Sequence, residues 1–296
     1  MNKDNYFPLR VKPKGDYFRL IALSLIWIWL IVFAVIPTGL VLFTSLLQQG
    51  DHELVRLQLT LDNYSALFNT IYFKIFIQSL LLAGSCSLIC LIIGYPFAYI
   101  LARAKPRYKG ILLLFVIIPF WTSSLVRTYA IVAILKTKGI LNTLLLNIGL
   151  IHKPLHLLYS SSAVMIGLVY SLLPFMILPL YANIEKLDTR LIDAARDLGA
   201  NKYRVFVKII IPLTLPGIIA GCMLVFLPAM SMFYIPDILG GAKSILIGNL
   251  IQNQFLTARN WPLGSAVSIG LTLMMGLLLL LYWRSTKQNK NGQNLL

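Results

Sequence analysis

Six long apolar stretches limit what this chain can fold into. They cover residues 20–47, 75–102, 111–135, 160–184, 209–236 and 262–283, and the only Asp, Glu, Lys or Arg within them is Arg127. The hydrocarbon core of a bilayer is about 30 Å thick and needs roughly 20 apolar residues of helix to cross it. The sequence therefore predicts an all-α membrane protein with six transmembrane helices.

The composition agrees with a lipid-exposed surface. Hydrophobic residues make up 58% of the 296 residues and charged residues only 12%, whereas a soluble domain has about a quarter charged residues. The net charge of +16 also permits a nucleic-acid partner. The positions of the basic residues decide between a membrane protein and a nucleic-acid-binding protein.

The basic residues are concentrated on one predicted side of the membrane. Of the 26 Lys and Arg residues, 18 lie in the segments 1–19, 103–110, 185–208 and 284–296. Because short cytoplasmic segments carry the excess of Lys and Arg, this side is predicted to be cytoplasmic. The expected organisation is a cytoplasmic tail (1–19), a six-helix domain (20–283) and a second cytoplasmic tail (284–296). Charges spread over four short segments speak against a nucleic-acid partner.

Prolines interrupt five of the six stretches. Each proline lacks a backbone donor and frees a carbonyl, which neighbouring helices or a water-filled cavity must then satisfy. This favours a transport path, although prolines are also commoner in membrane helices than in soluble ones. The seven are Pro37, Pro96, Pro119, Pro174, Pro179, Pro216 and Pro228.

The segment between the fourth and fifth stretches predicts a short amphipathic helix. Apolar residues recur at helical spacing, Asp188 or Thr189 can cap the start, and Gly199 suits the left-handed position after a helix. The predicted apolar stripe consists of Leu187, Leu191, Ala194 or Ala195, and Leu198. Such a helix could lie on lipid headgroups, but its polar face mixes acids with bases, which favours a groove in a partner protein.

The same segment resembles the EAA loop of ATP-binding cassette (ABC) importer permeases. The resemblance rests on Asp193-Ala194-Ala195, on Gly199, and on Ile209-x-Ile211-Pro212. Asp193 replaces the usual Glu and Ile211 the usual Leu. Further stretches are similar to the PotB-type permeases of spermidine/putrescine importers. They include Gly94-Tyr-Pro-Phe-Ala98, Pro119-Phe-Trp-Thr122, Leu173-Pro-Phe175 and Gly240-Gly-Ala-Lys243.

The resemblance implies a type I importer permease that moves polyamines and is not itself an enzyme. Its implied partners are a second permease subunit (PotC-type), a dimer of a cytoplasmic ATPase (PotA-type) that binds ATP and Mg, and an external polyamine-binding protein (PotD-type). The loop 185–212 would couple the chain to the ATPase. The implied coupling residues are Leu191, Asp193, Ala194, Ala195, Leu198, Gly199 and Pro212.

Two alternatives stay open. An ABC permease for another small cationic or amino-acid-like solute would have the same loop. A stand-alone secondary transporter would instead show ionisable relays and inverted repeats in its spans.

A polycationic cargo needs carboxylates and aromatic faces along its path. Outside the cytoplasmic segments acids are few, and Asp237, next to the fifth stretch and near Tyr234, is the first candidate. Trp121, Tyr170 and Tyr282 are the aromatic candidates. The competing roles are an interfacial cap for Asp237, packing for Trp121 and interfacial anchoring for the tyrosines. Arg127 would repel a cation and is expected to snorkel or pair at the outer boundary.

No cofactor, metal or catalytic site is expected in this chain. The segment Gly240-Gly-Ala-Lys-Ser244 ends like a phosphate-binding loop, but Ala242 stands where that loop requires Gly. His152 and His156 are separated by Pro154, which argues against a helical metal site. ATP must then be bound by a partner.

Overall fold

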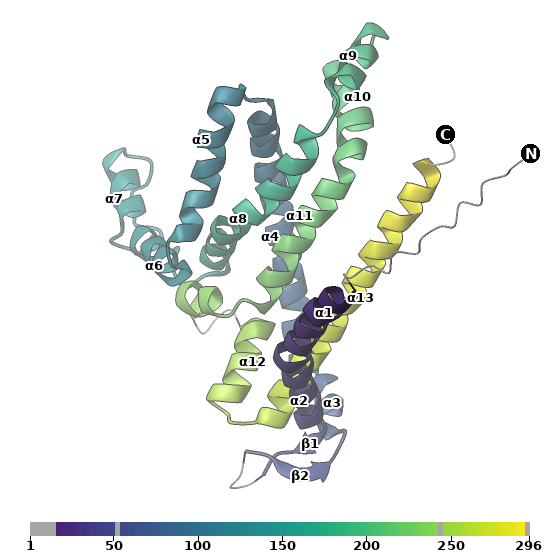
Figure 1. Ribbon diagram of the computed structural model, residues 1–296. Helices are drawn as coiled ribbons and strands as arrows, with labels where there is room; N and C mark the ends of the chain where they lie inside the picture. Colours follow the sequence, from purple (N-terminus) through teal and green to yellow (C-terminus); the bar gives the residue numbers. More distant parts are fainter. Residues whose placement is uncertain (1–15, 51–53, 242–244, 294–296) are drawn as a thin grey trace, which may run out of the picture.

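The computed structural model describes residues 16–50, 54–241 and 245–293. These residues form a helical bundle with one two-stranded ribbon (Figure 1). The helices are α1 (Asp16–Leu30), α2 (Ile36–Ser45), α3 (Asp62–Leu67), α4 (Thr70–Arg103), α5 (Pro106–Ile117), α6 (Ser124–Leu135), α7 (Ile140–Asn147), α8 (Ser161–Glu185), α9 (Thr189–Asp197), α10 (Lys202–Val205), α11 (Ile211–Ser231), α12 (Ile247–Leu256) and α13 (Trp261–Gln293). Short π or 3₁₀ segments are η1 (Ile31–Val35), η2 (Ile118–Trp121), η3 (Phe206–Ile210) and η4 (Pro236–Gly240).

The ribbon pairs β1 (Leu47–Gln48) with β2 (Arg56–Leu59) in antiparallel register. Leu47 lies opposite Leu59 and Gln48 opposite Arg56, with an irregularity between the two pairs. The ribbon lies at the end of the molecule opposite to α9 (Figure 1). We call these two ends the β1 end and the α9 end.

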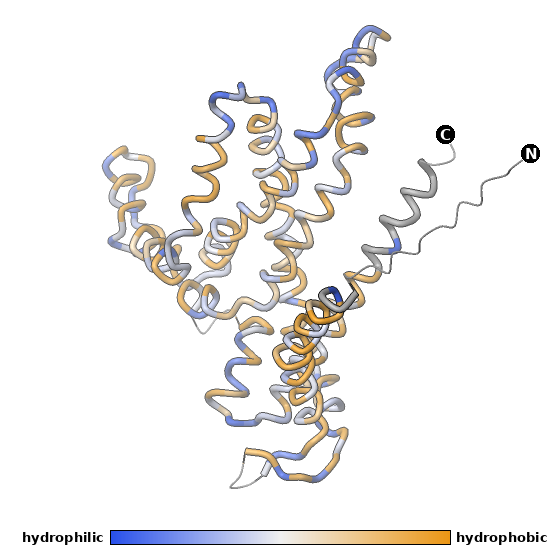
Figure 2. Tube along the Cα trace, viewed as in Figure 1, coloured by the Kyte–Doolittle hydropathy of each residue, from blue (hydrophilic) through white to orange (hydrophobic). Residues whose placement is uncertain are grey.

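Six helical stretches in the described residues are long and apolar enough to cross a membrane, as the sequence predicts. They are Arg19–Ser45, Thr70–Arg103, Ser124–Asn147, Ser161–Glu185, Lys202–Ser231 and Trp261–Leu280. Hydrophobic residues line the length of these helices, and hydrophilic residues gather at the tips of α9 and α10 and at the start of α5 (Figure 2).

The predicted third span, 111–135, is wrong as a single helix. The chain leaves α5 through the 3₁₀ turn η2, which contains Pro119, and Thr122 and Ser123 adopt extended backbone conformations. Pro119 cannot donate to the preceding turn, so the helix ends and α6 starts as a separate element. The stretch that meets the length requirement here is Ser124–Asn147, which joins α6 and α7.

Two other boundaries also differ from the sequence prediction. The fifth span ends at Ser231, because Met232 is extended and the chain then enters η4. The sixth helix continues to Gln293, so most of the predicted tail 284–296 is helical. Of the predicted tail 1–19, residues 1–15 lie outside the described residues, as do Asp51 and Glu53.

The core is the packing of α4, α8 and α11 against one another. Small residues let these helices approach closely, as is usual between membrane helices. A Cβ atom on Gly217 would lie 2.6 Å from the Cβ of Asn183, and one on Gly221 2.7 Å from the sulfur of Met176. The buried hydroxyl of Tyr95 in α4 lies 2.9 Å from Oγ1 of Thr214 in α11 and adds a polar link.

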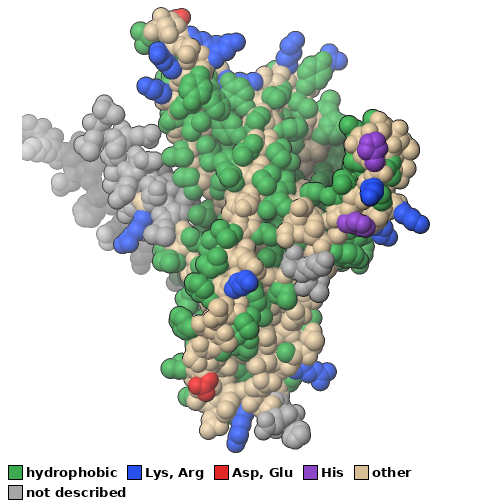
Figure 3. All heavy atoms as spheres, turned by 180° about the vertical axis from the view of Figure 1, so that it is seen from behind, with side chains coloured by type: hydrophobic (Ala, Val, Ile, Leu, Met, Phe, Trp, Pro, Cys, Tyr) green, Lys and Arg blue, Asp and Glu red, His purple; other side chains and the backbone are tan. Residues whose placement is uncertain are grey.

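The first helix lies outside this core. No residue in the most apolar window of Arg19–Ser45 is buried, and the main contact of α2 with another membrane helix in the described residues is with α13. Seen from behind, hydrophobic side chains cover much of the middle of the molecule, and Lys and Arg gather at the α9 end, with others beside the histidines, on the middle of this face and at the β1 end (Figure 3). This is the surface of a protein whose middle zone is in contact with lipid.

Prediction for the core. Gly217→Ala should destabilise the protein by about 1–3 kcal/mol, because the new methyl group overpacks the contact between α8 and α11. Gly84→Ala is the matched control, since a Cβ on Gly84 in α4 meets no atom within 4 Å. Alanine there should be neutral or stabilising by about 0.5–1 kcal/mol. Thermal unfolding of the purified variants in detergent measures both, and equal melting temperatures would contradict the packing.

Candidate functional site

α9 is a short helix that is capped at both ends. The Asp188 side chain accepts a hydrogen bond from the backbone N–H of Arg190 at 2.9 Å. At the other end Gly199 has a positive φ of 81°. The N–H of Ala200 bonds to the carbonyl of Ala195 at 3.0 Å and that of Gly199 to Arg196 at 2.8 Å, which is a Schellman motif. Both caps predicted from the sequence are confirmed.

The apolar residues of α9 lie on two sides of the helix, whereas the sequence predicts a single apolar stripe. Ile192, which the sequence analysis did not include, is the buried residue of this helix, with 5% of its surface exposed. Leu187 and Ala195 pack partly against the core. Leu191 and Leu198 belong to the predicted stripe, but they are 50% and 89% exposed. Helical spacing alone could not separate the inner from the outer apolar residues, because η3 and α10 provide the inner contacts of α9.

The exposed side of α9 combines apolar and charged groups. Leu198, Leu191 and Tyr203 of α10 are exposed, Tyr203 by 74%. Asp193 and Arg196 lie next to them and form an exposed ion pair at 3.7 Å. Exposed pairs of this kind contribute little stability. A protruding face of this composition suits a groove in another protein better than a lipid surface, where a basic face is expected.

A short connection joins α9 to the core helix α11. Asn201 caps α10 by accepting the N–H of Arg204 at 2.8 Å, and α10 continues through η3 into α11 without a loop. Pro212 is the second residue of α11 and comes directly after the π-helical η3. On the other side three residues, 186–188, separate α9 from α8, and Glu185 at the end of α8 pairs with Lys109 of α5 at 3.0 Å. Movement of α9 must therefore reach two core helices.

Two of the proposed path residues lie at a junction of α6, η4 and α12. The hydroxyl of Tyr234 is hydrogen bonded to Ser124 of α6. Asp237 in η4 is exposed, and its Oδ1 accepts a hydrogen bond from the side-chain amide of Asn249 in α12. Asn249 is 2% exposed and also donates to the carbonyl of Phe233 at 2.8 Å. Asn249 was missed by the sequence analysis, because a polar residue in a short helix gives no signal before the partners are known.

The aromatic candidates lie on other elements. Trp121 ends η2 and is 77% exposed, and Tyr170 is in α8 with 47% exposed. Tyr282 belongs to α13, but its side chain lies outside the described residues. No side-chain hydrogen bond in the described part of the chain joins Trp121 or Tyr170 to Asp237.

Arg127 forms no ion pair with an acid among the described residues, and its side chain is partly exposed. Its Nε and Nη1 atoms are buried and have no hydrogen-bond partner among the described residues. Arg127 follows Ser124 by about one turn of α6 and so lies on the same side of that helix as the serine that bonds to Tyr234.

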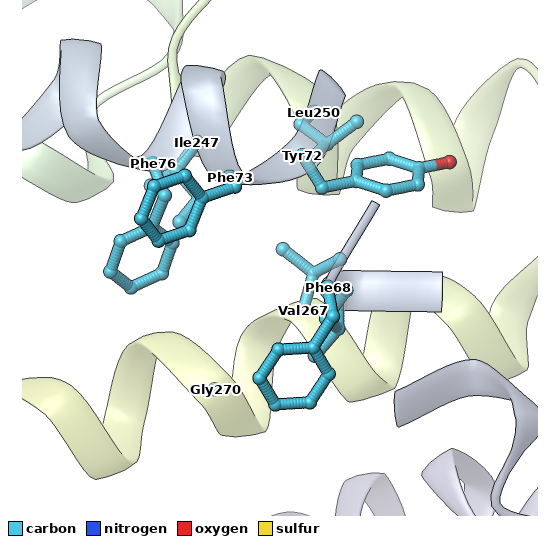
Figure 4. Close-up of a pocket in the computed structure, with 9 residues that line it drawn as sticks. Phe68, Tyr72, Phe73, Phe76, Ile247, Leu250, Val267 and Gly270 are labelled. Carbon is cyan, nitrogen blue, oxygen red and sulfur yellow. The ribbon is translucent and has the colours of Figure 1, made fainter. Parts of the chain in front are cut away.

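A separate apolar pocket of about 220 Å³ lies between α4, α12 and α13 near the β1 end (Figure 4). Its wall includes four aromatic residues, Phe68, Tyr72, Phe73 and Phe76. The lining offers almost no polar surface, so only its aromatic faces are available to a cation. No group of three or more His, Cys, Asp or Glu side chains suited to a metal ion is found in the described residues.

Comparison with known proteins decides the family. Residues 94–286 match the family described as binding-protein-dependent transport system inner membrane component. The chain belongs to this family.

Relatives and solved structures extend this result over almost the whole chain. The spermidine/putrescine transport system permease protein PotB of Haemophilus influenzae is 52% identical over 277 residues, which are 94% of this chain and 97% of the relative. PotB of Escherichia coli is 52% identical over 259 residues, 88% of this chain and 94% of the relative. A bacterial alginate ABC transporter in complex with its periplasmic protein has a chain that matches with a TM-score of 0.75 at 16% identity, covering 90% of this chain and 93% of that one.

The chain is thus a multi-pass inner-membrane permease with the type I ABC fold and is of the PotB type. It is a non-catalytic subunit of a transporter and acts in a complex with other subunits. The family match begins at Gly94 and includes α9.

Proposed function

We propose that this permease forms part of the translocation path for polyamines and is driven by a cytoplasmic ATPase that docks on α9. The observation that carries the proposal is the exposed, doubly capped α9 in a chain that is 52% identical to PotB permeases over nearly its full length. Those relatives are named for spermidine and putrescine transport.

The proposed orientation places the α9 end in the cytoplasm. The segments 103–110 and 185–208, which are rich in Lys and Arg, both lie at this end. By the positive-inside rule they face the cytoplasm, together with the tails 1–19 and 284–296. The β1 end then faces outward, where an external polyamine-binding protein (PotD-type) would deliver the cargo.

The proposed coupling works through rigid-body motion. Closure of an ATPase dimer (PotA-type) that holds ATP and Mg would move a groove that contains Leu191, Asp193, Ala194, Ala195 and Leu198. Because Gly199 ends α9 tightly and α10 runs on into Pro212 and α11, the motion reaches the membrane helices instead of being absorbed by a loop. A second permease subunit (PotC-type) would complete the path.

The physical task of such a path is gating. Each elementary charge that enters a cell with a negative interior gains about 2.3 kcal/mol per 100 mV. A polyamine is therefore already drawn inward by the membrane potential, and an open path would leak. We assign the first contacts of the cargo to Asp237 and Tyr234, with Trp121, Tyr170 and Tyr282 as aromatic contacts further along.

Test of the function. The chain, purified from membranes together with its partners and reconstituted in vesicles, should hydrolyse ATP faster when the binding protein loaded with spermidine or putrescine is added. Hydrolysis that responds to another cationic or amino-acid-like solute but to neither polyamine would overturn the cargo assignment. Transport without any associated ATPase would favour a secondary transporter and overturn the coupling.

Prediction for α9. Gly199→Val should cost about 1–2 kcal/mol in the left-handed position and loosen the end of α9, so fewer cargo molecules should enter per ATP hydrolysed. Gly199→Asn is the matched control, because Asn tolerates this conformation. The measurement is uptake divided by ATP hydrolysis in vesicles with equal amounts of inserted permease. Equal ratios for Val, Asn and the unchanged chain would contradict a coupling role that depends on this cap.

Prediction for the outer path. Asp237→Asn keeps the acceptor for Asn249 but removes the charge, and Trp121→Ala removes an exposed ring. Each should raise the spermidine concentration that half-saturates transport, by about tenfold for the charge. Asp62→Asn is the control, since Asp62 is an exposed acid at the β1 end whose carboxylate bonds to Thr60 at 2.7 Å. If Asp62→Asn has the same effect as Asp237→Asn, the charge of Asp237 acts at long range, and the proposed contact between Asp237 and the cargo is wrong.

A further inference from the structure

A second cavity, between α4 and the start of α8, has a different character from the apolar pocket. It has a volume of about 310 Å³ and is lined on one side by Gln78 and Ser85 of α4 and by Ser161 of α8. The other lining is apolar and includes Leu81, Met165 and Leu246. We call it the Gln78 pocket.

Contact with lipid would be energetically unfavourable for the polar groups of this pocket. Gln78 and Ser85 lie within the candidate span Thr70–Arg103, and both are exposed. No side-chain hydrogen bond in the described part of the chain uses Gln78, Ser85 or Ser161. An amide that faces hydrocarbon without a partner is strongly disfavoured, so this face of α4 meets water, a polar ligand or the second permease subunit.

The pocket is connected to Asp237 by hydrogen bonds. Asn249 bonds to Asp237 through its amide group, and its Oδ1 accepts the backbone N–H of Leu246 at 3.2 Å. Leu246 is part of the pocket wall. The following residue, Ile247, donates its N–H to Ser79 of α4 at 2.9 Å. The wall of the Gln78 pocket is thus held in place by the same side chain that holds Asp237.

We infer that the Gln78 pocket is a binding subsite for the polyamine cargo, an inference that rests on the proposed function. The side-chain oxygens of Gln78, Ser85 and Ser161 accept hydrogen bonds from an ammonium group, and Leu81, Met165 and Leu246 contact the adjoining methylene groups. The pattern of neutral acceptors beside an apolar wall fits a cation with an aliphatic chain better than it fits a compact ion.

The composition of the Gln78 pocket predicts that it binds a cation weakly. No Asp or Glu side chain is among its lining residues, and Ser161 lies in the first turn of α8, where the helix dipole contributes a partial positive charge. Both features lower the affinity for a cation. A site on a conduction path must release its cargo, so weak binding is what the function requires.

Two substitutions of one residue test the inference in opposite directions. In the reconstituted complex, Gln78→Leu should raise the half-saturating spermidine concentration by about tenfold, as expected for a lost hydrogen bond to a charged group. Gln78→Glu should lower that concentration and also lower the maximal uptake rate, because a carboxylate holds the ammonium group longer. Ser85→Ala should change the half-saturating concentration in the same direction as Gln78→Leu.

Ser87→Ala is the matched control for Ser85→Ala. Ser87 lies two residues further along α4 on the buried side, and its hydroxyl donates to the carbonyl of Cys222 at 3.4 Å. Its removal should leave the half-saturating spermidine concentration unchanged. A purely structural role of Gln78 would shift both Gln78 variants in one direction, and that result would overturn the inference.

The two proposals fail in different ways. If the unchanged complex responds to spermidine but both Gln78 variants keep its half-saturating concentration, the subsite is wrong and the proposed function stands. If the unchanged complex does not respond to spermidine or putrescine, the proposed function itself fails, and the subsite fails with it.

Discussion

The close packing of α4, α8 and α11 is the interaction on which the other parts of this permease depend. Glycines at the contacts bring backbones within reach of side chains such as Met176 and Asn183. In a bilayer the hydrophobic effect does not drive helices together, so van der Waals contact and buried hydrogen bonds must hold them. The bond between Tyr95 and Thr214 is one of the few polar links in this core, and it ties α4 to the helix that carries the coupling segment.

The coupling segment, α9 with α10 and η3, is held rigid by its attachment to this core. α9 is attached to α8 on one side and, through α10 and η3, to α11 on the other. Its buried residue Ile192 faces the bundle, while Leu191 and Leu198 point away from it. A helix with its inner side fixed and its outer side free is mechanically suited to transmit a push from a partner protein to the membrane helices.

At the opposite half of the molecule, Asn249 has a comparable role for the path. One buried amide bonds to the carboxylate of Asp237, to the carbonyl of Phe233 and to the backbone N–H of Leu246. The stretch that contains Phe233 and Asp237 and the stretch that begins at Leu246 are thereby fixed relative to one another. The exposed acid and the wall of the Gln78 pocket then change position together, which connects the outer contact of the cargo with the proposed subsite inside the span.

The sequence by itself determined the class of the protein, the number of candidate spans and the caps of α9. These properties depend on hydrophobic length and on local side-chain chemistry, which neighbouring residues along the chain supply. It did not predict the break of the third span at Pro119, although the proline was visible, because prolines within α4, α8 and α11 leave those helices continuous. Only the tertiary structure decided which apolar residues of α9 face the bundle, that Nε and Nη1 of Arg127 are buried without a hydrogen-bond partner in the described residues, and that Asn249 joins Asp237 to the Gln78 pocket. Each of these depends on how separate elements pack against one another, and such packing leaves no periodic signal in the sequence.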